Sequence, residues 1–157
     1  MINQLEVYMS MAYHPSDLAS LIEEHVRNLD FDTFVGRGLS GSIAVSSMAA
    51  RFNKEYLIIR KIGDSSHACL PAFGKLGKRW VFLDDIMASG HTFYETYIGV
   101  ENIVNKVEDY AKVWDRKFVR PEFVGTLLYG SGMFIPASDP SHSRQIDHFK
   151  PELADTF

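Results

Sequence analysis

Two adjacent acids, Asp84 and Asp85, are followed by small residues and then by Thr92, in the segment VFLDDIMASGHT. Backbone amides beside small side chains, at the start of a helix, form a site for an anion such as phosphate. Ser89 and Thr92 can add hydroxyl donors, whereas the acids repel phosphate and are suited to vicinal hydroxyls or a hydrated magnesium ion. A phosphate beside a diol is a ribose 5-phosphate, and the segment predicts this ligand. The alternative is that the acids merely end a strand and Thr92 merely caps a helix. This would explain each residue by itself, but it would not explain their full order.

Further cations lie in the region before this segment. Arg60 and Lys61 end an apolar run, and either they bind an anionic ligand or they are solvated charges at a strand end. His67 either donates a hydrogen bond to such a ligand or points to water. Cys69 is predicted to have no function, because no other ligands stand at a metal-binding spacing.

The composition sets limits on the class of protein. A chain of 157 residues, with 46% hydrophobic and 23% charged residues, is the size of one folded domain. The formal net charge of -4 disfavours nucleic acid as a partner. One cysteine cannot form an intrachain disulfide, and no apolar stretch approaches the ~18 residues that span a bilayer. The start has no secretory pattern, so we expect a cytoplasmic protein that does not bind membranes.

The hydrophobic periodicity predicts alternating strands and helices. Helices are predicted over 16–29, 42–52 and 92–114, and strands over 32–36, 56–60, 80–83 and 123–129. Ser16 or Asp17 is predicted to cap the first helix. Two apolar stripes are predicted to face a core: Leu18, Leu21, Ile22, His25, Val26 and Leu29 in the first helix, and Phe93, Tyr97, Val100, Val104, Val107 and Ala111 in the last. Residues 61–79 are predicted to form a long loop or hairpin, and the chain after Gly130 a polar tail.

This alternation predicts an α/β fold with a parallel twisted sheet and helices on both faces. Ligands of such sheets bind outside the carboxyl ends of the strands. Three predicted loops, 36–42, 60–79 and 84–92, leave that edge of the sheet. They carry the acids, the cations and the small residues, so we expect one site there.

The order of residues 80–92 resembles the phosphoribosyl-diphosphate signature of the type I phosphoribosyltransferases. FVGRGLSG, residues 34–41, stands where this family has a loop that binds pyrophosphate. YLIIRK before a mobile loop is similar to the orotate branch, and the Arg-Gly-Leu to purine-type members. The resemblance covers about 30–129 of a predicted single domain, 1–157. The sequence departs from the pattern at 63–66, where orotate enzymes usually have a lysine, and at His91, where a smaller residue or lysine is more usual.

The resemblance implies transfer of a 5-phosphoribosyl group from phosphoribosyl diphosphate to a nucleobase, with release of pyrophosphate, by a magnesium-dependent homodimeric enzyme of nucleotide metabolism. The implied catalytic residues are Arg60, Lys61, His67 and Asp85. Asp84 and Asp85 would hold magnesium through water. The implied substrate-binding residues are Arg37, Gly38, Leu39, Asp84, Asp85, Ala88, Ser89, Gly90, His91 and Thr92. The loop 61–79 is expected to close over the pyrophosphate.

Two other functions stay open: a non-catalytic phosphoribosyl or nucleotide-binding regulator on the same fold, and a hydrolase of nucleosides or nucleotides. The terminal segments could form a hood over the base. For Tyr8, Met9, Met11 and Tyr13 the alternative is a dimer interface. Tyr129 and Phe134 either build a base pocket or pack in the core.

Overall fold

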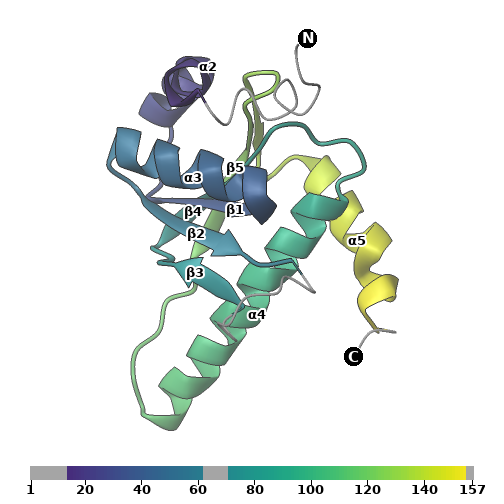
Figure 1. The fold of residues 1–157 in the computed structure, drawn as a ribbon. Helices are drawn as coiled ribbons and strands as arrows, with labels where there is room; N and C mark the ends of the chain where they lie inside the picture. The colour runs from purple at the N-terminus through teal and green to yellow at the C-terminus, as the bar shows by residue number, and fades with distance from the viewer. Residues whose placement is uncertain (1–13, 62–70, 155–157) are drawn as a thin grey trace.

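The computed structural model of the protein describes residues 14–61 and 71–154, with side chains up to residue 150 (Figure 1). The described elements are, in chain order, α2 (Pro15–Asn28), β1 (Thr33–Arg37), α3 (Gly38–Phe52), β2 (Glu55–Ile59), β3 (Ala72–Gly74), β4 (Arg79–Asp84), α4 (His91–Val113), β5 (Glu122–Leu128), β6 (Met133–Pro136) and α5 (Pro140–Ala154). Over these ranges, none of the helices is long and apolar enough to cross a membrane.

The six strands form one sheet in the order β3-β2-β1-β4-β5-β6. The four central strands are parallel, and the short edge strands β3 and β6 are antiparallel to their neighbours. After β1 the chain first extends the sheet on one side, to β2, and later on the other side, to β4. The carboxyl ends of β1 and β4 therefore flank a topological switch point, the place where ligands of such sheets bind.

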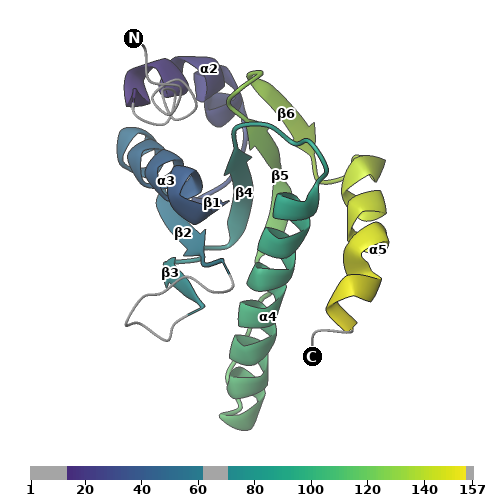
Figure 2. The same ribbon diagram turned by 45° about the vertical axis from the view of Figure 1, so that its right-hand side comes forward.

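Helices cover both faces of the sheet, which confirms the predicted fold class. Figure 2 shows α2 and α3 on one face and α4 and α5 on the other. Neighbouring strand residues alternate between two cores: Phe34 packs with α2 and α3, and Val35 packs with α4. Val81 and Phe82 of β4 divide in the same way. This burial on both faces explains why the central strands have apolar runs.

The helices begin differently from the sequence prediction. The N-cap of α2 is His14, without a side-chain hydrogen bond, and Pro15 opens the helix, so the predicted cap at Ser16 or Asp17 is wrong. Residues 36–42 do not form a loop, because β1 ends at Arg37 and α3 begins at Gly38. The predicted stripes are mostly buried, but Leu21 and Val107 are exposed.

The segment after Gly130 is more ordered than the predicted polar tail. It contains β6, which pairs with β5, and α5, which packs against α4. The start of α5 has a recognisable cause, since the Asp139 carboxylate accepts a hydrogen bond from the Ser141 amide (2.9 Å) and Pro140 takes the first helical position. An acid before a proline is a helix start signal.

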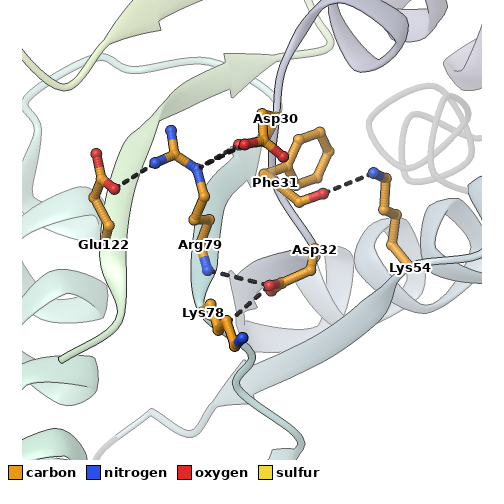
Figure 3. A network of polar contacts seen from close by, with 7 residues as sticks. All are labelled: Asp30, Phe31, Asp32, Lys54, Lys78, Arg79 and Glu122. Atoms are coloured by element: carbon orange, nitrogen blue, oxygen red, sulfur yellow. Dashed lines mark hydrogen bonds and ion pairs between the residues drawn. The ribbon is translucent and has the colours of Figure 1, made fainter. Parts of the chain in front are cut away.

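A polar network ties the chain together at the amino ends of the strands (Figure 3). The Asp32 carboxylate accepts hydrogen bonds from the backbone amides of Lys78 (2.8 Å) and Arg79 (3.3 Å). The Arg79 guanidinium pairs with Glu122 of β5 and donates to the Asp30 carbonyl. Each of these charges therefore has a partner of opposite charge or a backbone group.

Candidate functional site

The carboxyl ends of β1, β2 and β4 meet at a cavity of about 230 Å³ beside the switch point. Its lining comes from three stretches of chain that are far apart in the sequence. These residues are Arg37, Ser40, Lys61, Asp84, Asp85, Ile86, Met87, Ala88, Ser89, Gly90, Thr92 and Phe93. The parallel sheet brings them together, because the carboxyl ends of parallel strands lie at one edge.

The acid pair is held in place by backbone hydrogen bonds from the turn that follows β5. The Tyr129 amide donates to the Asp84 carbonyl (2.9 Å), and the Gly130 amide donates to the Asp85 carbonyl (2.8 Å). The Asp84 side chain accepts from the Asp85 amide (3.0 Å), and the Asp85 side chain accepts from the Ile86 amide (2.7 Å). These hydrogen bonds therefore hold the backbone and the side chains of both acids in place at the cavity.

Burial raises the pKa of Asp84 to about 7, because desolvation disfavours its charged form. The negative charge of Asp85 also raises this pKa, whereas Lys61 and the hydrogen bond from the Asp85 amide lower it. Near neutral pH the Asp84 carboxyl can therefore both donate and accept a hydrogen bond. A perturbed carboxyl in a cavity is typical of a functional site.

The small residues after the acids lead into the N-terminus of α4. Gly90 is the N-cap with φ 80°, a left-handed conformation that favours glycine, and it is buried. The Ser89 hydroxyl accepts from the His91 amide (3.2 Å), so Ser89 already contacts the first amide of the helix. The positive end of the helix dipole and the hydroxyls of Ser89 and Thr92 make this end of the cavity suitable for an anion.

The C-terminal helix α5 supports this loop from outside the cavity. A Cβ on Gly90 would lie 2.4 Å from Cδ of Gln145, so the Gln145 amide packs directly on the loop backbone. Gln145 Nε2 donates to the Met87 sulfur at 3.0 Å. Phe149 packs its ring against His91 and Tyr94. The helix that the sequence prediction missed therefore fixes the position of the small-residue loop.

Two cations reach the cavity from the other strand ends. Arg37 ends β1 and forms an ion pair with Glu95 of α4, and its side chain is only 7% exposed. Lys61 follows β2, and its stem lies against Gly38, where a Cβ would be 2.8 Å from the lysine Cε. Gly38 has φ 73°, which glycine adopts without strain. The absence of a side chain there gives Lys61 its room.

Four other predicted site residues, Gly38, Leu39, Arg60 and His91, do not line this cavity. Arg60 places its guanidinium over the Phe73 ring, 5.8 Å from the centroid, and does not line the cavity. Leu39 is 71% exposed on the first turn of α3. His91 faces Glu95 and Phe149 instead of lining the cavity. His67 lies outside the described residues, as do Cys69 and the terminal segment from Tyr8 to Tyr13.

The positions of Tyr129 and Phe134 support the alternative in which they pack in the core. Tyr129 is buried within the core cluster on the α2 and α3 side of the sheet, and Phe134 packs against the same cluster. Neither of the two lines the cavity.

Sequence reasoning missed four residues of the lining, Ser40, Ile86, Met87 and Phe93, and Glu95 behind it. Met87 was within the motif and could have been found from its position. Ser40 and Glu95 carried no local signal, because their places depend on where α3 begins and on how the two helices face each other.

The oxygen ligands at the cavity fit magnesium better than a softer metal. Magnesium is usually held by one or two carboxylates, with water and substrate phosphates completing its shell. Asp84 and Asp85 supply two such carboxylates. Among the described residues, no group of three or more His, Cys, Asp and Glu side chains could hold a metal by itself.

Comparisons with known proteins give structural likenesses only. No family model matches the chain, and no curated protein matches it. The fold is similar to an orotate phosphoribosyltransferase of Francisella tularensis, with 21% identity and a TM-score of 0.46 over 75% of this chain and 50% of that chain. It is also similar to the UMP synthase of Leishmania donovani, with 19% identity and a TM-score of 0.44 over 75% of this chain and 21% of that chain.

A third similar structure is the adenine phosphoribosyltransferase of Saccharomyces cerevisiae, in complex with an imino-altritol bisphosphate and adenine. It has 17% identity and a TM-score of 0.40, over 80% of this chain and 75% of that chain. The chain spans about half the length of the orotate phosphoribosyltransferase and about a fifth of the UMP synthase.

Proposed function

We propose that this protein transfers a 5-phosphoribosyl group from phosphoribosyl diphosphate to a nitrogenous base. The bond from the ribose C1 atom to pyrophosphate breaks, a bond from C1 to a base nitrogen forms, and the base loses a proton. The observation that carries the proposal is the meeting of an acid pair, a small-residue helix N-terminus and two cations in one cavity. Each of these groups matches a different part of phosphoribosyl diphosphate.

The small-residue loop would bind the 5-phosphate. Ala88 and Gly90 leave the backbone accessible, and Ser89 and Thr92 offer hydroxyl donors. This phosphate is remote from the breaking bond, so its binding energy positions the ribose without taking part in the chemistry.

Asp84 and Asp85 would bind the ribose hydroxyls. In that position they would also lie close to the positive charge that develops on the ribose ring as the bond to pyrophosphate breaks. The charged form of Asp84 would stabilise this state. Burial raises the pKa of Asp84 and so favours the neutral form, and a cation at the site would oppose that effect. Magnesium, when bound through water by these two acids, would neutralise part of the pyrophosphate charge.

Arg37 and Lys61 would meet the pyrophosphate as its negative charge grows. Arg37 offers a planar fork of donors, and Lys61 offers a point charge on a flexible stem. Stabilisation of charge that develops only in the transition state is usually the largest catalytic contribution. Lys61 is our choice for this role, and His67, outside the described residues, would assist it.

One observation favours a second candidate, a regulator that binds the phosphoribosyl group without transferring it. Arg60, which the resemblance places at the leaving group, contacts Phe73 instead. A regulator tolerates the loss of such a cation, whereas the acid pair and the small-residue loop are needed in both functions. The nucleobase, a homodimeric state and the cytoplasmic location stay predictions from the sequence.

A screen for pyrophosphate release distinguishes the two functions. Phosphoribosyl diphosphate and magnesium are incubated with single purines and pyrimidines, and pyrophosphate is measured. Release that depends on one base supports the transferase. Tight binding of phosphoribosyl diphosphate with no release for any base supports the regulator, and release that does not depend on a base would contradict both functions.

A further inference from the structure

Arg37 and Glu95 form an ion pair across the switch point of the sheet. Arg37 ends β1 and caps α3, and Glu95 lies in the second turn of α4. Arg37 Nη1 contacts Glu95 Oε2, and the two side chains are 7% and 26% exposed. Arg37 lines the cavity, whereas Glu95 does not. The carboxylate therefore holds the guanidinium from behind the cavity wall.

The same carboxylate oxygen also faces an imidazole. Nδ1 of His91 lies 3.6 Å from Glu95 Oε2, one helical turn earlier on α4. The His91 ring meets Phe149 of α5 edge-on, with centroids 5.1 Å apart. Glu95 thus joins the end of β1, the start of α4 and, through His91, the C-terminal helix.

A buried arginine needs such a partner for two reasons. The guanidinium is charged at every relevant pH, so burying it without a counter-ion costs much free energy. Its long side chain also loses about 2 kcal/mol of rotamer entropy when it is held in one place. A fixed carboxylate supplies the counter-ion and selects the rotamer before any ligand arrives. Preorganisation of this kind lowers the cost of binding.

From this arrangement we infer that Glu95 is a positioning residue that holds Arg37 ready for the pyrophosphate group. The identity of that group rests on the function proposed above. The guanidinium has five N–H donors, so it can contact Glu95 and a phosphate at the same time.

The opposite role is a carboxylate that competes with the phosphate for Arg37. The two roles predict opposite signs: loss of a positioning residue weakens pyrophosphate binding, and loss of a competitor tightens it. Calorimetric titration with magnesium pyrophosphate measures this sign. For E95A we expect about tenfold weaker binding, the size of one charge-assisted hydrogen bond. E95Q keeps an acceptor oxygen but loses the negative charge, so we expect its affinity to lie between that of E95A and that of the wild type.

The matched control is E101Q. Glu101 lies on the same helix and also pairs with an arginine, Arg120, at 2.8 Å, but neither residue lines the cavity. The affinity of E101Q for pyrophosphate should equal that of the wild type. In a double-mutant cycle, E95A should have no further effect in an R37A background, because Glu95 acts through Arg37. An equal loss in both backgrounds, or tighter binding by E95A, would overturn the inference.

A measurement without ligand separates this inference from the proposed function. The ¹H–¹⁵N signal of Arg37 Nε reports the order of its side chain, and we expect it to be rigid in the wild type and in E95Q but mobile in E95A. If the wild type binds no pyrophosphate, the proposed function fails. The signal of Arg37 then decides by itself whether Glu95 holds the Arg37 side chain in place. A signal equally rigid in E95A overturns the inference, provided that circular dichroism shows E95A to be folded.

Discussion

The two ends of the central strands both carry acids and cations, but they use them differently. At the amino ends, Asp32 accepts hydrogen bonds from two backbone amides, and Arg79 is paired with Glu122 (Figure 3). At the carboxyl ends, Asp84 and Asp85 are like charges side by side, and burial raises the pKa of Asp84 to about 7. The amino end is arranged for stability. The carboxyl end keeps an arrangement that costs stability and that a cationic or hydroxyl-rich ligand would relieve.

A lysine from each end gives the largest expected contrast. Lys61→Ala removes a cation from the cavity, and turnover should fall by roughly 10²–10³-fold, by analogy with the loss of one oxyanion donor. Substrate affinity should change much less, because the contact strengthens mainly in the transition state. Steady-state kinetics with the active base measures both.

Lys54→Ala is the control. Lys54 donates to the Phe31 carbonyl at 2.7 Å at the amino end, so its loss should lower stability and leave turnover per folded molecule unchanged. If Lys61→Ala lowered affinity and hardly changed turnover, Lys61 would only bind.

The second contrast concerns stability. Asp32→Ala leaves the Lys78 and Arg79 amides without their carboxylate acceptor, and hydrogen bonds to a charged group contribute about 1.5–3 kcal/mol. We expect the free energy of unfolding to fall by about 2 kcal/mol, with no change in affinity for phosphoribosyl diphosphate. Urea denaturation and calorimetry measure the two quantities. A large loss of affinity in the folded variant would mean that the amino end also takes part in binding.

These two contrasts also show what the sequence could predict. The central strands and the site segment 84–92 could be found because their signals are contiguous: apolar runs, an acid pair and small residues. The side chain of Arg60 could not be placed, since its contact with Phe73 depends on the antiparallel pairing of β3 with β2. Glu95 could not be found either, because its role follows from the approach of α4 to the end of β1.

The helix α5 was missed for a different reason. Over residues 140–150, where its side chains are described, Phe149 is the most buried apolar residue, so this part of the helix shows little apolar periodicity. Its packing on Gly90 through Gln145 is a tertiary contact that no local pattern predicts.

The smallest expected effect is a dependence of stability on pH. The pKa of Asp84 is raised in the folded state, so its stabilising contribution is complete below its unfolded value of 3.8 and is lost as the pH rises toward about 7. Asp84→Asn removes the buried charge, so it should raise the melting temperature by a few degrees at pH 8 and by much less at pH 5. Thermal melts at both pH values check this. Equal shifts at the two pH values would show that the charge of Asp84 is not the cause.

The central claim is that the acid pair at the carboxyl ends binds the ribose and magnesium of phosphoribosyl diphosphate. The most direct test is calorimetric binding of phosphoribosyl diphosphate, with and without magnesium, to the wild type and to the variant Asp84→Asn with Asp85→Asn. We predict magnesium-dependent binding by the wild type and none by the folded double variant. Unchanged affinity in the double variant would contradict the account.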